Sequence, residues 1–140
     1  MRLTAYTDYT LRTLMYLGYN QERLVTIKEI AIAHGISKNN LTKVVRQLGI
    51  TGLVETVRGR NGGLKLNKNP NNINIREVVM QSESDFFMAE CFNPKKDTCL
   101  YNPCRLKKEL NLATKAYLAV LDNVTLNDLV KNGAPKGLPD

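Results

Sequence analysis

The three cysteines are the residues of this chain best suited to chemistry, because all of them lie within a window of 14 residues. Seven residues separate Cys91 from Cys99, and four separate Cys99 from Cys104. Three cysteines cannot form a closed set of disulfides, and a structural zinc site usually needs four ligands. Three closely spaced thiolates can hold three irons of a cubane cluster. The spacing therefore leaves an iron–sulfur cluster, another metal, or unligated redox-active or buried thiols.

The sequence offers little for enzymatic catalysis. His34 is the only histidine, so any nucleophile with a histidine base would depend on it. Its place just before Gly35 is typical of the C-terminal end of a helix, where it would be neither a ligand nor a base. No carboxylate dyad stands out, and no GxxxxGK[ST] or GxGxxG loop precedes a helix. We therefore predict that the protein is not an enzyme.

The excess of positive charge is confined to the first half of the chain. The 140 residues carry a formal net charge of +7. Residues 1–70 contain 11 basic and 4 acidic side chains, whereas residues 71–140 contain 9 of each. A solvated surface is the plain interpretation of a charged run, but so strong an asymmetry usually indicates a polyanionic partner. The charge pattern predicts binding to nucleic acid.

The elements that would position these charges read as a helix-turn-helix. Residues 3–19 have apolar side chains at helical spacing. Thr26 is predicted to begin a short helix, with Glu29 completing a capping box, and Gly35 to end it. Ser37 is predicted to begin a second helix, whose apolar face is Leu41, Val44, Val45 and Leu48. Two short helices joined by a tight turn that contains glycine are typical of this motif.

The second helix of such a motif reads base edges in the major groove with its first residues. Asparagine can pair bidentately with adenine, and lysine can donate to guanine. Ordinary solvated side chains on an exposed helix are the alternative. The DNA contacts predicted on these two helices are Thr26, Ser37, Lys38, Asn39, Asn40, Lys43 and Arg46.

A β-hairpin is predicted after the second helix. Residues 53–58 and 64–66 alternate between apolar and polar types, and Asn61-Gly62 between them is the strongest turn signal in the segment. A plain surface hairpin is the alternative, but a basic hairpin that follows a recognition helix is typical of a wing. Arg58, Arg60 and Asn61 are therefore further candidates for contact with DNA phosphates or the minor groove.

The second half predicts a long dimerisation helix. Pro70 marks a boundary, Asn74 is predicted to cap a short helix, and residues 85–103 are irregular. From Pro103 onward, apolar residues recur at steps of three and four, and Thr125 with Asp128 is predicted to cap a last short helix. The members of this apolar seam are Leu106, Leu110, Ala113, Tyr117, Val120 and Val124.

The predicted fold class is mainly α with a small β-hairpin wing, that is, a winged helix-turn-helix plus a long dimerisation helix. Residues 1–70 would bind DNA, residues 71–131 would form the cluster-binding loop and the dimerisation helix, and residues 132–140 would be a flexible tail. No run of about 18 apolar residues suggests a membrane span, and no secretory signal is visible. We therefore expect a cytoplasmic protein with reduced cysteines.

Four separated motifs resemble, in order, those of the iron–sulfur winged-helix repressors, the family of the NsrR, RirA and IscR types. They are MRLTAYTDYTLR at the start, ETVRGRNGG in the wing, the three-cysteine loop followed by CRLKKEL, and LDNVTLNDLV near the end. The resemblance covers roughly residues 1–131. It implies a homodimeric bacterial transcriptional repressor whose cluster state controls its binding to double-stranded operator DNA.

Individual residues place the resemblance nearest to the NsrR type. The IscR type uses a histidine shortly after its third cysteine, and this chain has none beyond His34. NsrR-type sensors of nitric oxide hold a 4Fe–4S cluster through three cysteines and an aspartate of the partner subunit's N-terminal helix. The resemblance therefore implies Cys91, Cys99, Cys104 and the partner subunit's Asp8 as ligands.

Other readings stay open at this point. The RirA type shares the VRGRNGG wing and the AECF segment of this chain, which keeps regulation by iron or cluster availability as the alternative to nitric oxide. A 4Fe–4S cluster is expected, with 2Fe–2S as the alternative nuclearity. An electron-transfer protein, or a DNA-binding protein with a metal site that senses nothing, would use the same cysteines.

Overall fold

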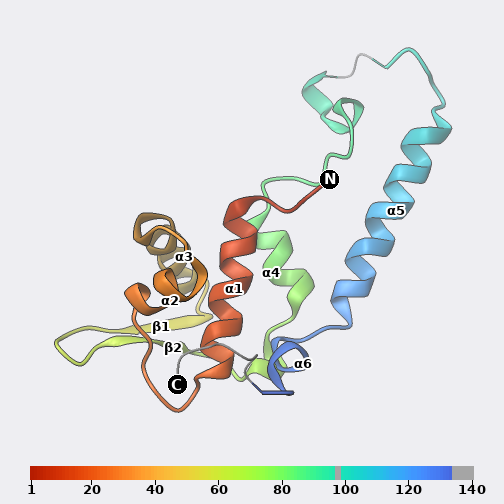
Figure 1. Cartoon of the computed structure of the whole chain (residues 1–140). Coiled ribbons are helices and arrows are strands. Elements are labelled where there is room, and N and C mark those ends of the chain that lie inside the picture. Colours follow the sequence, from red (N-terminus) through yellow and green to blue (C-terminus); the bar gives the residue numbers. More distant parts are fainter. Residues whose placement is uncertain (97–98, 134–140) are drawn as a thin grey trace.

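The computed structural model describes residues 1–96 and 99–133, and it is mainly helical with one two-stranded antiparallel hairpin (Figure 1). The longer elements are α1 (Ala5–Tyr19), α2 (Ile27–His34), α3 (Lys38–Ile50), β1 (Val54–Val57), β2 (Gly63–Leu66), α4 (Ile75–Ser82), α5 (Arg105–Asp122) and α6 (Leu126–Val130). Three short 3₁₀ helices, η1 (Pro70–Asn72), η2 (Glu90–Phe92) and η3 (Pro94–Lys96), lie between them. Most of the predicted flexible tail, from residue 134 onward, lies outside the described residues.

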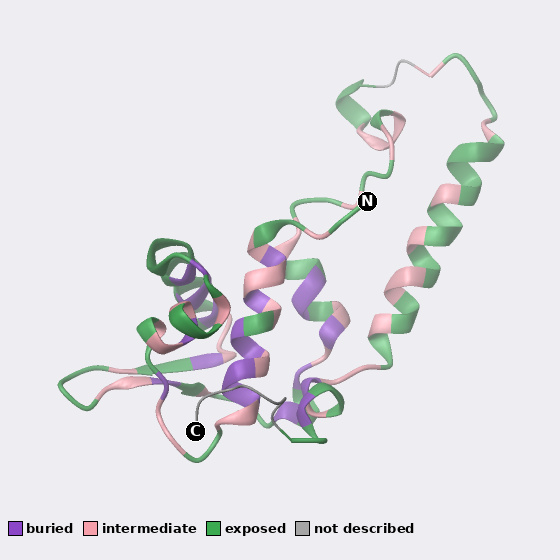
Figure 2. Cartoon of the chain, in the orientation of Figure 1, coloured by how far each residue is buried: buried purple, intermediate pink, exposed green. Residues whose placement is uncertain are grey.

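Helix α1 forms the centre of the fold. It contacts α2, α3, α4, α6 and β2, and Figure 2 shows the buried positions concentrated along it and its neighbours. The core that these elements share consists mainly of Leu14, Tyr16, Leu17, Val25, Ile30, Leu41, Val44, Leu48, Val54, Leu64, Ile73, Ile75, Val78, Val79 and Leu126. Because α1 contacts both α3 and the wing, its position determines where those two elements lie.

Buried threonines extend the inward face of α1. Thr7, Thr10 and Thr13 are all buried, although their hydroxyls are polar. Thr10 donates to the carbonyl of Tyr6 at 2.8 Å, and Thr13 donates to that of Tyr9 at 2.8 Å. A buried hydroxyl is tolerated when it has a hydrogen-bond partner. The chain can therefore bury a face of α1 that looks only weakly apolar in the sequence.

The two helices of the predicted helix-turn-helix are confirmed, with one local correction. Gly35 adopts a left-handed φ of 62° at the end of α2, and the Ser37 hydroxyl caps α3. Thr26 caps α2, but the expected return bond from the Glu29 side chain to complete a capping box is not formed there. Glu29 instead binds the guanidinium of Arg23 and the hydroxyl of Tyr16. A guanidinium offers stronger, charge-assisted hydrogen bonds than a single backbone N–H.

The predicted hairpin is present, and its register differs from a two-residue Asn-Gly turn. Val57 pairs with Gly63, which leaves a loop of five residues, 58–62, at the tip. Gly59, and not Asn61 or Gly62, has the positive φ (112°), and the Gly62 amide donates to the carbonyl of Gly59 at 3.0 Å. Val25 adds an antiparallel bridge to Leu64, so the α1–α2 connection lies beside the second strand of the wing.

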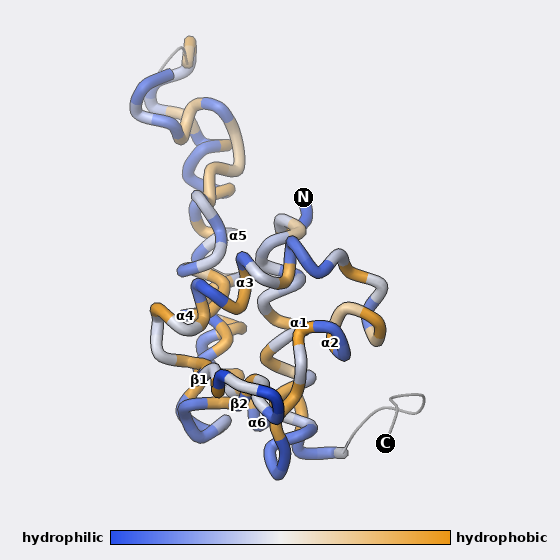
Figure 3. Tube along the Cα trace, turned by 90° about the vertical axis from the view of Figure 1, so that its left-hand side faces the viewer, coloured by the Kyte–Doolittle hydropathy of each residue, from blue (hydrophilic) through white to orange (hydrophobic). Residues whose placement is uncertain are grey.

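Helix α5 projects away from the compact body and is anchored at its C-terminal end (Figure 1). There the amide of Ile75 donates to the carbonyl of Val124 at 3.0 Å, and the amide of Leu126 donates to that of Ile73 at 2.8 Å. The capping box predicted for Thr125 and Asp128 is formed. In the side view of Figure 3, α5 extends beyond the other helices, together with the described residues of the segment from Cys91 to Cys104 that precedes it, which we call the cysteine loop.

None of the 18 residues of α5 is buried, even though apolar side chains recur along it.

Within the described ranges, 1–96 and 99–133, no helix combines the length and the apolar character that crossing a bilayer requires.

Candidate functional site

The amphipathic character predicted for α3 is confirmed. Leu41, Val44, Val45 and Leu48 are buried in the core, whereas the polar side chains of the opposite face are exposed, namely Lys38, Asn39, Asn40, Lys43 and Arg46. The Ser37 hydroxyl accepts a hydrogen bond from the Asn40 amide at 3.2 Å. This cap fixes the first turn of α3 at the surface, so the polar side chains that would read base edges begin on an ordered turn.

The two capping hydroxyls of the motif lie in similar settings. The Thr26 hydroxyl accepts a hydrogen bond from the Glu29 amide at 3.1 Å, just as the Ser37 hydroxyl accepts one from the Asn40 amide. Thr26 and Ser37 are both exposed. A hydroxyl that accepts in a cap still has its own O–H to donate. Each helix N-terminus also presents unpaired N–H groups and the positive end of the helix dipole. Both positions therefore suit contact with DNA phosphates.

The wing places the remaining candidates at an exposed tip. Arg58, Arg60 and Asn61 are exposed in the five-residue loop. Among the residues that the structure describes, the hairpin forms one ion pair, in which the Lys65 ammonium lies 3.4 Å from the Glu55 carboxylate. Within residues 1–96 and 99–133, no carboxylate lies within ion-pair distance of Lys38, Lys43, Arg46, Arg58 or Arg60. These five cations are available to a polyanion.

The cysteines lie on the segment that leads into α5. Cys91 belongs to η2, Cys99 to the irregular stretch, and Cys104 is the N-cap of α5. All three are free and half-buried. The Cys104 sulfur accepts from the Lys107 amide at 3.4 Å, and the Lys107 ammonium lies 5.7 Å from the ring centre of Phe92. Lys107 thus contacts both Cys104 and the residue beside Cys91.

The three cysteines predicted as ligands do not come together as a metal site within the described part of a single chain. Among the described residues, no group of three or more histidine, cysteine or acidic side chains is close enough to hold a metal ion. Asp8 lies in the first turn of α1, where its carboxylate accepts from the Arg12 Nε at 3.0 Å.

The donor chemistry nevertheless fits an iron–sulfur cluster, because free thiolates are the usual ligands of such clusters. The Cys104 sulfur also lies at the positive end of the long α5 dipole, which favours a negatively charged ligand.

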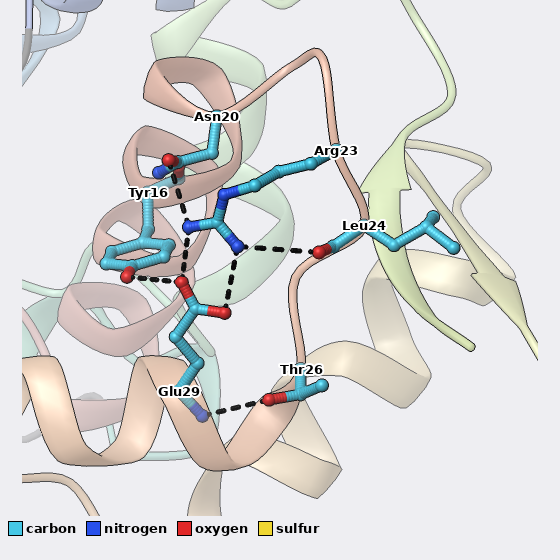
Figure 4. A network of polar contacts seen from close by, with 6 residues as sticks. All are labelled: Tyr16, Asn20, Arg23, Leu24, Thr26 and Glu29. Carbon is cyan, nitrogen blue, oxygen red and sulfur yellow. Dashed lines mark hydrogen bonds and ion pairs between the residues drawn. The ribbon is translucent and has the colours of Figure 1, made fainter. Parts of the chain in front are cut away.

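A polar cluster between α1 and α2 is the feature that sequence reasoning missed. In Figure 4, Arg23 reaches Glu29 and Asn20, and the Tyr16 hydroxyl also points to Glu29. The guanidinium of Arg23, followed by the Tyr16 hydroxyl, lowers the pKa of Glu29 through hydrogen bonds against the opposing effect of burial. Burial first, and then the hydrogen bond to Glu29, raises the pKa of Tyr16. Glu29 is therefore a carboxylate and Tyr16 a neutral donor.

His34 lies against this cluster as an uncharged side chain. It ends α2, as expected, and its ring packs edge-on against Tyr16 with the centroids 5.8 Å apart. Burial, and then the charge of Arg12, lowers the pKa of His34, while Asp8 opposes the shift. Its Nε2 is buried and has no hydrogen-bond partner among the described residues. These surroundings agree with a packing role for His34.

The comparison with protein families now identifies the chain. The model of the Rrf2 family, described as iron-dependent transcriptional regulators, matches residues 3–132. The HTH-type transcriptional regulator NsrR of Bacillus licheniformis is 53% identical over 134 residues, with 94% of each chain covered. That of Bacillus subtilis is also 53% identical, covering 94% of this chain and 92% of the relative.

Solved structures agree on the fold. The IscR of T. potens superposes with a TM-score of 0.78 at 23% identity, over 100% of this chain and 93% of that one. CymR, described as the global cysteine regulator of B. subtilis, gives a TM-score of 0.77 at 26% identity, over 96% and 99%. The first likeness supports the winged helix-turn-helix fold alone. Together with the sequence relatives, these findings show that the chain belongs to the Rrf2 family and is a transcriptional regulator of the NsrR type, not an enzyme.

Proposed function

We propose that the chain is a homodimeric repressor in which an iron–sulfur cluster senses nitric oxide and controls binding to operator DNA. The observation that carries this proposal is that three free thiols lie within 14 residues of sequence, on the segment that leads into α5, and that no residue of α5 is buried. In this proposal residues 1–70 bind DNA, and residues 71–131 hold the cluster and form the dimer. Since operator DNA is the target, the chain would act in the bacterial cytoplasm.

The proposed DNA contacts combine the N-cap of α2 and the exposed face of α3 with the wing. Side chains on α3 suit base edges in the major groove, and the wing arginines suit phosphates or the minor groove. The contacts are Thr26, Ser37, Lys38, Asn39, Asn40, Lys43, Arg46, Arg58, Arg60 and Asn61. All ten are exposed.

Removing one of these charges is expected to weaken DNA binding and its dependence on salt. Lys43→Ala and Arg60→Ala should each reduce the slope of log affinity against log salt by about one counterion. Fluorescence anisotropy with a labelled duplex at several salt concentrations measures both quantities. Lys115→Ala, on the exposed surface of α5, is the matched control and should leave the slope unchanged. An unaltered slope in both Lys43→Ala and Arg60→Ala would place the DNA elsewhere.

Homodimerisation is proposed because α5 leaves part of its apolar seam exposed, although Val124, the last predicted member, lies beyond the end of the helix and packs against the core. Leu106 is 66% exposed and Val120 is 67% exposed, although side chains of this size usually gain stability from burial. A groove of about 650 Å³ separates α5 from the N-terminal segment, and Phe87 and Tyr117 are among its lining residues. A second copy of the chain would cover these surfaces. It would also set two recognition helices on half-sites about 34–36 Å apart.

An acidic residue in this seam is expected to produce monomers. Val120→Asp places a charge where the partner helix would pack, and an unpaired buried charge strongly opposes association. Because Val120 is exposed within one chain, the fold of the monomer should persist. Light scattering after size-exclusion chromatography measures the mass, and circular dichroism checks the fold. Ala119→Asp, an exposed position outside the seam, should remain dimeric; equal masses for the two variants would reject α5 as the interface.

The proposed ligands are Cys91, Cys99, Cys104 and the partner subunit's Asp8. When bound, the cluster would supply iron that reacts with nitric oxide. A 4Fe–4S cluster is proposed, because three thiolates and one carboxylate provide one ligand for each of its four irons. The Asp8 side chain is 44% exposed, so a second chain has access to its carboxylate. Arg12 holds that carboxylate in each free subunit at 3.0 Å.

The chain's own contacts would carry the signal to DNA. Asp8 lies at the start of α1, and α1 contacts both α3 and β2. A ligand bond from Asp8 to the partner's cysteine loop would therefore fix the position of the elements that read DNA. A difference of about 2.7 kcal/mol between the two arrangements would change operator affinity about a hundredfold.

Nitric oxide titration of anaerobically purified protein tests this function. Adding nitric oxide should bleach the absorption of the cluster and release an operator duplex in parallel. Asp8→Ala is expected to retain a cluster whose response to nitric oxide is altered. Protein that stays colourless after anaerobic iron–sulfur reconstitution, or that binds its operator equally with and without the cluster, would contradict the proposal.

Regulation by iron or cluster availability is the second candidate, since the matching family is described as iron-dependent. The same titration separates the two candidates. If an iron chelator releases the operator while stoichiometric nitric oxide does not, the site reports iron supply. Release by nitric oxide before any iron leaves the protein supports the nitric oxide sensor.

A further inference from the structure

The connection between α1 and α2 lies directly against the wing. Val25 and Leu64 exchange two backbone hydrogen bonds, of 3.0 and 2.7 Å. Beside them, a Cβ atom on Gly63 would lie 2.9 Å from the carbonyl oxygen of Val25 and 3.0 Å from the Cβ of Leu24. The two backbones therefore meet with no room for a side chain. The second strand of the wing starts at this contact.

The side chain of Arg23 fixes this connection to the helices (Figure 4). Its guanidinium binds both carboxylate oxygens of Glu29, one of them from Nη1 at 3.0 Å. It also donates to the Asn20 Oδ1 at 3.1 Å and to the carbonyl of Leu24 at 3.5 Å. A guanidinium holds a carboxylate with two parallel bonds, which fixes direction as well as distance.

Glu29 is in turn held by the core. The Tyr16 hydroxyl donates to it at 2.8 Å, and Tyr16, in the last turn of α1, is only 2% exposed. An unbroken series of contacts thus runs from α1 through Tyr16, Glu29 and Arg23 to Leu24 and Val25, and from there to Gly63 and Leu64 at the base of the wing.

We propose that Arg23 and Glu29 are positioning residues for DNA binding, which hold the wing at the angle where its tip reaches the duplex. Neither residue needs to touch DNA. The inference rests on the proposed contact between the wing and DNA, and it adds that this contact is set from the α1–α2 connection. Loss of the Arg23–Glu29 fork would loosen Val25 from Leu64 and leave the recognition helix in place.

Hydrogen exchange tests this inference without DNA. Glu29→Gln replaces one carboxylate oxygen with an NH₂ group. Because that group donates hydrogen bonds and cannot accept one from the Arg23 guanidinium, one of the two bonds is lost. We expect the amides of Val25 and Leu64 to exchange about fivefold faster, while those of α1 stay protected. Glu22→Gln, an exposed carboxylate of the same connection, is the matched control and should change neither. Unaltered exchange at Val25 and Leu64 would overturn the inference whether or not the chain binds DNA.

A double-mutant cycle tests the effect on the wing. The probe is a 30-base-pair duplex selected from a random library by the full-length wild-type chain. If Glu29 acts through the wing, Arg60→Ala should weaken binding about tenfold in the wild type but less than about threefold in Glu29→Gln. Lys43→Ala, on the recognition helix, should weaken binding equally in both backgrounds. Full additivity with Arg60→Ala would overturn the inference.

Arg23→Lys provides a second variant that keeps the positive charge and loses the two-bond fork. It should show the same faster exchange at Leu64 and the same reduced effect of Arg60→Ala. Wild-type exchange and full additivity in this variant would show that charge alone, and not the fork, is sufficient, and would reject the positioning role. If the wild type itself fails to bind any duplex, the proposed function fails, and the exchange measurements still decide the inference.

Discussion

Replacing Cys99 by alanine is expected to yield a folded dimer that assembles no cluster and binds operator DNA about a hundredfold more weakly than the cluster-loaded wild type. The Cys99 thiol donates to the carbonyl of Tyr101, in its own loop, at 3.4 Å, and it lies outside the buried core, so its removal should disturb the helical body little. One of the three proposed thiolate ligands would nevertheless be lost. Iron and sulfide content per chain after anaerobic reconstitution, together with operator titration, measures the effect.

The neighbouring residue provides a matched control for this variant. Leu100 is 92% exposed in the same loop and has no thiol, so Leu100→Ala should keep wild-type iron content and operator affinity. A full cluster in Cys99→Ala would refute the ligand assignment. Loss of the dimer together with the cluster would show instead that the thiols of this loop stabilise the fold.

A second large effect is expected from Gly62→Ala in the wing. A Cβ atom at this position would lie 2.1 Å from the carbonyl oxygen of Val57 and 2.9 Å from that of Gly59. Both atoms are backbone, so the loop that carries Arg58 and Arg60 must change its path. We expect operator affinity to fall at least about tenfold and the salt slope to fall by about two counterions, since two cations move.

Gly49→Ala separates this effect from a general effect of added methyl groups. Gly49 lies in α3, where the nearest atom to an added Cβ is 4.0 Å away. Alanine also favours a helix over glycine by about 0.5–1 kcal/mol. That variant should melt at the same or a slightly higher temperature and bind DNA normally. Unchanged operator affinity in Gly62→Ala, with the fold intact by circular dichroism, would exclude the wing tip from the complex.

The local features of this fold could be predicted because short-range chemistry determines them. Ser37 and Thr125 have side-chain oxygens at the start of apolar helical patterns, and both cap helices in the structure. The alternation of apolar and polar residues around 53–66 predicted the hairpin correctly, because the pairing of two short neighbouring strands depends mainly on the turn between them. The spacing of the α5 seam predicted a long helix, since periodicity over many residues is a strong signal.

Features that depend on distant residues could not be predicted in the same way. Glu29 has the spacing of a capping box, but Arg23 and Tyr16 approach it only after α1 and α2 have packed. The threonines of α1 look polar in the sequence, and their burial follows only from the packing of other elements against α1. The spacing of the cysteines suggests one site, yet no such cluster forms among the described residues of a single chain.

The anchoring of α5 at its C-terminal end makes this helix a lever arm. The backbone bonds of Ile75 and Leu126 act as its pivot, and Cys104 lies at the opposite end. With a rise of 1.5 Å per residue, the arm is about 27 Å long. A tilt of about 5° at the pivot therefore displaces Cys104 by about 2 Å, close to the length of an iron–sulfur bond. Small rotations at the base are thereby magnified at the thiols.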